Sequence, residues 1–360
     1  MPARVLAIAQ TPELGGAEYG LLRIARRLPE RGFDVELAAP EPGPLLERAR
    51  EAGLPVHLMA VGGLSAGAWP RAVLSWPRAR QLMRAVRPDL VYLNGTVAQR
   101  LAPAFAGAPL VPHVHDLLDV APRPWRSDRF WRTTPVVLCD SQAVARAAAA
   151  VGAPEDRLRV VHCPVDPPLT SPRPEWANGL PVVGYVGRVE PRKGTLDLMR
   201  AARLLLHRRP DTRVVVVGDD SLGASSDYAL RVREEAERLG ERVLMLGAVE
   251  EARALMPWFD VLCVPSRSEP FGTVAAEALA AGTPVVATDS GGMAEYVVPG
   301  RNGALVPPGE PEALAEALDG VLGRGGELAA AARADAAPFA SDRVADAVAA
   351  ALREALEWRR

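Results

Sequence analysis

Two glutamates in the second half of the chain stand where they could bind a phosphorylated sugar. Glu269 lies in a predicted loop after a strand that ends near Pro265, and Glu277 lies in a helix that we expect to start near Gly272. The first N–H groups of that helix, from Phe271 to Val274, point at the space between the two carboxylates. Because free N–H groups at a helix N-terminus bind anions and carboxylates bind hydroxyls, this arrangement favours a nucleotide sugar as ligand. Two surface charges are the alternative, but the segment around them is apolar.

Two cations precede this element in the chain. Arg188 is expected at the end of a strand and Lys193 at the entry to the next helix, a placement that suits a diphosphate. Of the 42 lysines and arginines, Lys193 is the one lysine. A bias toward arginine follows from codon usage, so a position that keeps lysine indicates a need for a compact ammonium group.

The first half carries a second set of polar residues at predicted strand ends. Gly15 and Gly16 open a helix and can present bare N–H groups to an anion, but they lack the G-x-G-x-x-G spacing of a dinucleotide fold, which disfavours an NAD enzyme. His113 and His115 lie on one face of what we take as the fourth strand, and Asp116 follows them. Zinc would need further clustered ligands, so we predict no metal site.

Five residues of the first half are candidates for binding an acceptor molecule. The tryptophans among them could pack on a ligand or fill the core. The candidates are Glu18, Trp69, Asn94, Asp116 and Trp125.

Composition narrows the class of protein. The net charge of -2, with no long block of either sign, argues against nucleic acid as a partner. Three cysteines without metal-like or paired spacing fit a reducing, cytoplasmic setting. No apolar run reaches the roughly 18 residues of a membrane span, and the mixed-sign loop at 119–132 supports membrane contact only weakly.

The elements that position these residues alternate between strands and helices, which predicts parallel sheets covered on both faces. At 360 residues, the chain is expected to form two domains. We predict a Rossmann-like acceptor-side domain over 1–166, a linker over 167–180 and a Rossmann-like nucleotide-sugar-binding domain over 181–338. A C-terminal helix over 339–360 either caps the second domain or crosses back to the first.

The sequence resembles glycosyltransferase family 4, also called glycosyl transferases group 1, over nearly the whole chain. The resemblance rests on the E-x7-E element with the strand that follows it, on Gly15-Gly16-Ala17-Glu18, on His115-Asp116 and on the segment from Gly187 to Gly194. It implies the GT-B fold, an α/β class with two facing doubly wound domains and a deep cleft between them. It also implies a retaining, metal-independent transfer from a nucleotide-diphosphate sugar, which acts as donor substrate, with no cofactor.

The resemblance also assigns roles to individual residues. Arg188 and Lys193 would hold the diphosphate, Glu277 the ribose and Glu269 the donor sugar, while His115 would lie near the sugar and Gly16 would offer its N–H to the distal phosphate. The catalytic set is then His115, Glu269, Arg188 and Lys193. The remaining residues of the donor site are Gly15, Leu246, Gly247, Val249, Phe271, Gly272, Thr273 and Val274.

The sequence leaves the identity of the acceptor open. A small molecule or natural product with a hydroxyl group is the preferred acceptor, and a membrane lipid or a cell-envelope polysaccharide is the alternative. A nucleotide-sugar epimerase or a phosphorylase on the same architecture is a rival enzyme. A non-catalytic nucleotide-sugar-binding partner protein is a rival of another class.

Overall fold

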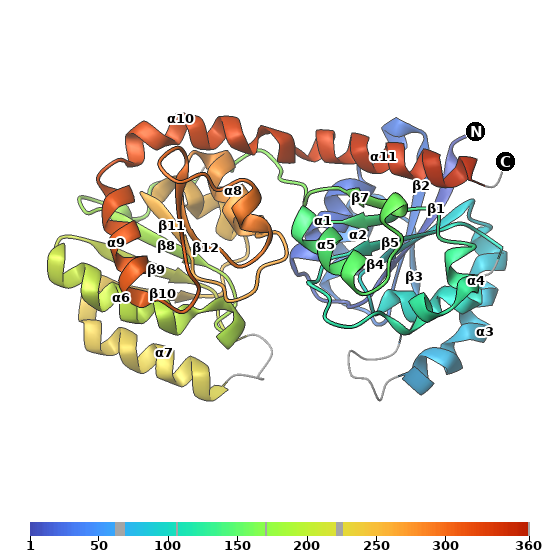
Figure 1. The fold of residues 1–360 in the computed structure, drawn as a ribbon, viewed down its shortest axis with the longest axis horizontal. Coiled ribbons are helices and arrows are strands. Elements are labelled where there is room, and N and C mark those ends of the chain that lie inside the picture. Colours follow the sequence, from blue (N-terminus) through green and yellow to red (C-terminus); the bar gives the residue numbers. More distant parts are fainter. Residues whose placement is uncertain (62–68, 106, 170, 221–225, 359–360) are drawn as a thin grey trace. The chain divides into compact units, whose positions relative to one another are not determined.

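The chain forms two compact units. The computed structural model describes residues 1–61, 69–105, 107–169, 171–220 and 226–358. Unit 1 comprises Met1–Pro164 together with Phe339–Arg360, and unit 2 comprises Val165–Pro338 (Figure 1). Within the described residues, no helix is both long enough and apolar enough to cross a membrane.

Unit 1 is built on a seven-stranded parallel sheet of order β3-β2-β1-β4-β5-β6-β7. Its strands are β1 (Ala3–Ala9), β2 (Phe33–Ala39), β3 (Val56–Leu58), β4 (Leu90–Asn94), β5 (Leu110–Val114), β6 (Val137–Cys139) and β7 (Leu158–Val160). Both faces of the sheet are buried: Val5 and Ala7 of β1 join one hydrophobic cluster, and Leu6 and Ile8 join the other. A strand covered on both faces must be apolar at every position, which explains the continuous run in β1.

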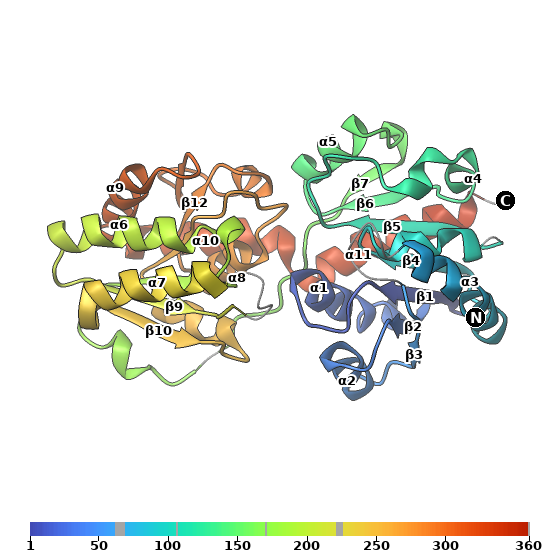
Figure 2. The same ribbon diagram turned by 90° about the horizontal axis from the view of Figure 1, so that it is seen from below.

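Helices cover both faces of this sheet (Figure 2). One cluster contains side chains of α1, α2 and α11, and the other contains side chains of α3, η3 and α5. The helices of unit 1 are α1 (Gly16–Ala25), α2 (Pro44–Glu51), α3 (Trp69–Val86), α4 (Asp128–Trp131), α5 (Gln142–Ala150) and α11 (Ser341–Glu357), with the 3-10 segment η3 (Ala98–Phe105).

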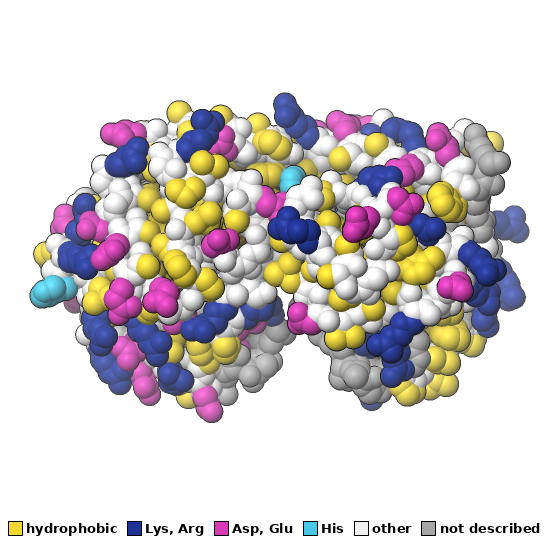
Figure 3. Space-filling view, viewed as in Figure 1, with side chains coloured by type: hydrophobic (Ala, Val, Ile, Leu, Met, Phe, Trp, Pro, Cys, Tyr) yellow, Lys and Arg dark blue, Asp and Glu magenta, His cyan; other side chains and the backbone are white. Residues whose placement is uncertain are grey.

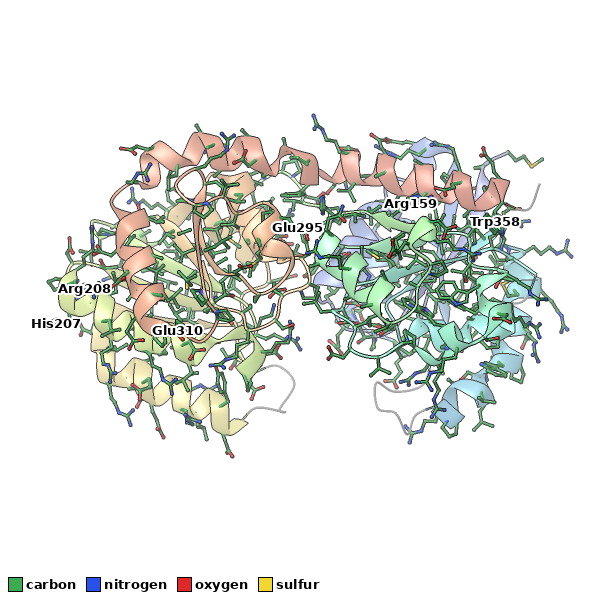
Figure 4. All side chains as sticks on the ribbon, in the orientation of Figure 1. Arg159, His207, Arg208, Glu295, Glu310 and Trp358 are labelled. Carbon is green, nitrogen blue, oxygen red and sulfur yellow. The ribbon has the colours of Figure 1, made fainter. Side chains whose placement is uncertain are left out.

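The C-terminal helix α11 packs on unit 1. Its buried Val344, Val348 and Leu352 join the cluster that includes α1. At its far end, Arg159 of β7 donates to Glu354 at 2.5 Å, and Figure 4 shows Arg159 and Trp358 along this helix. The helix therefore lies on the first domain, which is one of the two positions expected from the sequence.

Unit 2 is built on a six-stranded parallel sheet of order β10-β9-β8-β11-β12-β13. Its strands are β8 (Val182–Val186), β9 (Arg213–Val217), β10 (Val243–Gly247), β11 (Val261–Val264), β12 (Val285–Thr288) and β13 (Gly303–Val306). Its helices are α6 (Thr195–Arg208), α7 (Ser226–Leu239), α8 (Thr273–Ala281), α9 (Pro311–Leu322) and α10 (Gly325–Ala336). Helix α6 packs against α7 and α9, and α8 packs against α10.

The prediction of two doubly wound parallel sheets is confirmed, but the sequence reading missed three strands. The strands β3, β7 and β13 were not predicted because they are only three or four residues long and partly exposed, so they lack a clear apolar run. As a result, the strand with His113 is the fifth of unit 1, and our description of it as the fourth was wrong.

Candidate active site

Both units place polar side chains just after the carboxyl ends of neighbouring strands. In open α/β sheets this edge is where ligands bind. We call the set in unit 2 the donor cluster, formed by Arg188, Lys193, Ser266, Glu269 and Glu277, and the set in unit 1 the histidine network, formed by Asn94, His113, His115 and Asp140.

An ion pair lies at the centre of the donor cluster. The Nζ atom of Lys193 lies 2.7 Å from Oε2 of Glu269, and the Ser266 hydroxyl donates to the same oxygen at 2.9 Å. Glu269 is 7% exposed, so its charge is compensated by these two donors rather than by water. Lys193, the one lysine of the chain, therefore binds Glu269, the first glutamate of the E-x7-E element.

Lys193 reaches this position because the backbone turns sharply behind it. It ends a single 3-10 turn (Pro191–Lys193), and Gly194 follows with a φ of 69°. A Cβ at Gly194 would lie 1.9 Å from the carbonyl oxygen of Pro265. Glycine is thus needed both for the left-handed backbone and for the close approach to the strand end.

The helix that carries Glu277 begins as the sequence predicts. Gly272 precedes α8 with a φ of 88°, and the Tyr296 hydroxyl donates to the carbonyls of Phe271 and Gly272 at 2.8 Å. Thr273 and Val274 are the first residues of the helix, and an α-helix leaves its first N–H groups without an intrahelical acceptor. Phe271 is buried and packs on Tyr296, so it anchors the loop before α8 to the protein interior.

Arg188 is the most exposed cation of the donor cluster. Its side chain is 42% exposed, and its guanidinium lies 3.2 Å from Oε1 of Glu190. The Tyr185 hydroxyl donates to the Arg188 carbonyl at 2.7 Å, which fixes the backbone while the side chain remains at the surface. Arg188 can therefore exchange Glu190 for an incoming anion.

Three residues assigned to the donor site by resemblance lie at the end of β10: Leu246 and Gly247 are its last two residues, and Val249 follows. Gly247 has a φ of 69°, and its carbonyl accepts from the N–H of Gly218 at 2.7 Å. Leu246 is partly exposed and Val249 is exposed. This part of the chain thus presents backbone and small apolar groups at the same sheet edge.

In unit 1, a single carboxylate joins His113 of β5 to His115, the first residue after that strand. Oδ2 of Asp140 accepts from Nδ1 of His115 at 2.8 Å, and Oδ1 of Asp140 lies 2.9 Å from Nε2 of His113 without the alignment of a hydrogen bond. The two imidazole rings lie 4.2 Å apart, which confirms that they share one face of the strand. Asp140 was not among the predicted site residues.

Parallel pairing explains why these residues meet. Asn94 lies opposite His113, and Val114 lies opposite Cys139, so the ends of β4, β5 and β6 coincide. Asp140 is the first residue after β6. Residues that follow the carboxyl ends of parallel strands are candidates for a ligand site. Asp140 could have been predicted in this way, because it directly follows the three-residue strand β6.

Burial and charge act in opposite directions on the pKa values of the network. Burial alone would raise the pKa of Asp140, but the two histidines lower it well below the usual range. Burial lowers the pKa of His115, yet Asp140 more than offsets this and the net pKa is raised. Burial and the neighbouring His115 lower the pKa of His113. The network therefore favours a charged His115 and a neutral His113 around an ionised Asp140.

The other ring nitrogens also have partners. Nε2 of His115 lies 3.0 Å from Oδ1 of Asn94, and Nδ1 of His113 is hydrogen-bonded to the Tyr92 hydroxyl. With both nitrogens of His115 facing oxygen atoms, the ring is held in one orientation. Asn94, predicted as an acceptor-binding residue, is fully buried and supports His115.

The histidine network also brings together three groups that could ligate a metal. Nitrogen and oxygen atoms of His113, His115 and Asp140 lie within 4.8 Å of one another. The 2.8 Å distance between Nδ1 of His115 and Oδ2 of Asp140 is that of a direct hydrogen bond, which needs no ion. The geometry is therefore that of a hydrogen-bonded network.

Glu18 lies close to this network. It is 4% exposed, and burial raises its pKa, although the nearby His115 acts in the opposite direction. Gly15 and Gly16 are exposed at the start of α1, where their N–H groups can meet a ligand. A Cβ at Gly15 would lie 3.0 Å from the Glu18 carboxylate, so this turn is tightly packed.

The other predicted acceptor-binding residues lie in different environments. Asp116 is exposed. Trp125 is 5% exposed, and its indole N–H donates to Gln99, which favours the core-filling alternative. Trp69 begins α3, but its side chain lies outside the described part of the chain.

Two family profiles match the chain. The profile described as glycosyl transferases group 1 matches residues 169–337, and the profile described as glycosyltransferase family 4 matches residues 14–168. Relatives include the D-inositol 3-phosphate glycosyltransferases of Stackebrandtia nassauensis, 30% identical over 97% of this chain and 89% of theirs, and of Acidothermus cellulolyticus, 32% identical over 99% and 89%. The chain belongs to glycosyltransferase family 4, and it is an enzyme.

Solved structures agree with this family. HepE of Anabaena in complex with UDP and glucose is 27% identical, covers 98% of this chain and 99% of its own, and superposes with a TM-score of 0.85. Sucrose-phosphate synthase of Thermosynechococcus elongatus, 21% identical with a TM-score of 0.77, shares the fold. The fold is GT-B, with two Rossmann-like domains, as the resemblance implied.

Proposed function

We propose that this glycosyltransferase moves a sugar from a UDP-sugar to a hydroxyl of a small polar acceptor, with retention of anomeric configuration and without a metal. The observation that carries the proposal is the donor cluster. It joins one compact cation, one exposed guanidinium, a helix N-terminus and two carboxylates at a single sheet edge.

Each group of the donor cluster matches a part of the donor. Lys193 and Arg188 suit the diphosphate, and the N–H groups of Thr273 and Val274 add donors for phosphate oxygens. Glu277 suits the ribose hydroxyls and Glu269 the sugar hydroxyls. In unit 1, we assign the N–H of Gly16 to the distal phosphate and His115 to the sugar. UDP is the first nucleotide to test because the similar HepE structures contain UDP or UDP-glucose.

The reaction breaks the bond between the anomeric carbon and the diphosphate oxygen and forms a bond from the same carbon to the acceptor oxygen. Negative charge then develops on the departing diphosphate, where Lys193 and Arg188 stabilise it. The acceptor's proton can pass to that leaving oxygen, so a separate general base is not required.

The acceptor proposed first is a small polyol that carries a phosphate group. The support is the name shared by relatives about 30% identical, D-inositol 3-phosphate glycosyltransferase. Proton NMR of a reaction containing UDP-glucose or UDP-N-acetylglucosamine and inositol phosphate would test both the acceptor and the retention of anomeric configuration. We expect a glycoside with the anomeric configuration of the donor, and an inverted product would contradict the proposal.

The test also separates the rival functions. A non-catalytic partner would bind UDP and form no glycoside with any acceptor. An epimerase would change the sugar while it is still attached to the nucleotide. Product formation only with a lipid-linked acceptor would favour the membrane-lipid alternative.

A further inference from the structure

Helix α3 of unit 1 carries an unusual concentration of positive charge. From Ala52 to Pro88 the sequence has no acidic residue, whereas the chain as a whole contains 44. The arginines of this stretch all fall on α3 or directly after it: Arg71, Arg78, Arg80, Arg84 and Arg87. Figure 3 shows basic and hydrophobic side chains side by side over the part of unit 1 where α3 lies.

The inner face of α3 fixes the orientation of the helix. Ala72 and Ala79 are fully buried, and the helix packs against η3. The indole N–H of Trp76 donates to the carbonyl of Arg100 at 3.1 Å. The opposite face must therefore point away from the core of unit 1.

That outward face has an apolar strip of its own. At 3.6 residues per turn, five of its residues fall within an arc of about 80°. Four are apolar and one is a glutamine: Pro70, Leu74, Pro77, Gln81 and Ala85. All five are exposed, and Leu74 has 78% of its surface accessible.

Arginines flank the strip on both sides. Arg71 and Arg78 lie along one edge, and Arg80 and Arg84 lie along the other, by the same helical spacing. All four are exposed, and none of them belongs to an ion pair formed among the described residues. On α7, by contrast, Arg238 pairs with Glu234.

We propose that this face of α3, defined by Leu74, Pro77, Arg78, Arg80 and Arg84, binds the surface of an anionic lipid bilayer. An interfacial helix inserts an apolar strip at the level of the head groups while flanking cations contact lipid phosphates. Nucleic acid would match the arginines but leave Leu74 without a role. The inference goes beyond the proposed function, since docking determines where the enzyme works and not which hydroxyl it glycosylates.

Sedimentation with lipid vesicles tests the proposal on the full chain. We expect binding to vesicles of phosphatidylcholine mixed with phosphatidylglycerol, weak binding to phosphatidylcholine alone, and loss of binding as salt is raised. The double variant Arg78→Gln/Arg84→Gln should weaken the partition coefficient roughly tenfold or more. Leu74→Glu should weaken it as well.

Matched controls come from α7 of unit 2. This helix also exposes a leucine and arginines, but it carries acidic residues among them. Leu230→Glu and Arg231→Gln/Arg238→Gln should leave vesicle binding unchanged. Donor binding and thermal unfolding of all variants should match those of the wild type, so that a loss of membrane binding is separated from misfolding and from a failure of the proposed function.

Three outcomes would overturn the proposal. The first is equal binding to neutral and anionic vesicles. The second is wild-type binding by the α3 variants. The third is binding of an oligonucleotide, but not of vesicles, that depends on the α3 arginines, which would make this face a nucleic-acid site.

Discussion

The donor cluster and the histidine network sit at equivalent sheet edges, but they are built in opposite ways. In the donor cluster the cations remain accessible: the side chain of Arg188 is 42% exposed and that of Lys193 is 19% exposed. In the histidine network the side chain of His115 is 10% exposed and that of Asp140 is 4% exposed. The first can exchange its partners for a ligand, whereas the second is enclosed by protein, and Nδ2 of Asn94 and Oδ1 of Asp140 are left there without a hydrogen-bond partner among the described residues.

This difference predicts where substitutions act. Changes in the donor cluster should reduce donor use while the protein stays folded. Changes in the histidine network should reduce stability first, because they leave buried polar groups without partners.

The largest effect is expected at Asp140. Asp140→Ala removes the carboxylate shared by His113 and His115 and should lower the free energy of unfolding by about 3–5 kcal/mol. Urea denaturation would measure the loss. Asp140→Asn, which keeps the shape and one acceptor for His115, should lose less. If Asp140→Ala were as stable as the exposed control Asp119→Ala, the claim that changes in the histidine network reduce stability would be wrong.

The next effect is expected at Lys193. Lys193→Ala should lower kcat/KM for the donor by about 10²–10³-fold, because it removes a group that stabilises charge on the leaving diphosphate. Its unfolding free energy should fall less than that of Asp140→Ala. Arg192→Ala, at the neighbouring exposed position, is the matched control in steady-state kinetics. Equal activity of the two variants would remove Lys193 from the donor site.

A third effect concerns the backbone at the start of α8. Gly272→Ala forces a Cβ to within 2.7 Å of Met293 at a φ of 88°, so we expect a loss of about 1–3 kcal/mol in unfolding free energy. Gly320→Ala, in the last turn of α9 with open space around it, should instead gain about 0.5–1 kcal/mol. Thermal unfolding of the pair would show whether the donor cluster depends on this turn.

The smallest effect is expected at Glu18 and depends on pH. Burial raises the pKa of Glu18, so the folded state disfavours its charged form. The free energy of unfolding is therefore lowered once the pH rises above the pKa that Glu18 has in the unfolded chain. Glu18→Gln should therefore raise stability near pH 8 by up to about 1 kcal/mol and have no effect well below pH 4. A stability difference that did not change with pH would show that the charge of Glu18 is not the cause.

The sequence alone predicted the donor cluster more completely than the histidine network. Glu269 and Glu277 lie on one loop and the helix that follows it, so their spacing defines their geometry. Lys193 drew attention by its residue type, yet its ion pair with Glu269 joins segments 76 residues apart and became visible only in the structure.

Asp140 shows which contacts cannot be predicted from the local sequence. It follows the short strand β6, and its partners lie on β5 and directly after it, so only the strand order brings them together. Trp125 shows a second limit, because an aromatic residue in a loop can bind a ligand or fill the core. Its burial and its bond to Gln99 depend on tertiary packing that local spacing does not encode.

The most direct test of the account is calorimetric binding of UDP to the wild type and to Lys193→Ala, each with and without EDTA. We expect the wild type to bind UDP equally well in both conditions and Lys193→Ala to lose most of its affinity. Binding that EDTA abolishes, or full affinity in Lys193→Ala, would contradict the claim that the donor cluster holds the diphosphate without a metal.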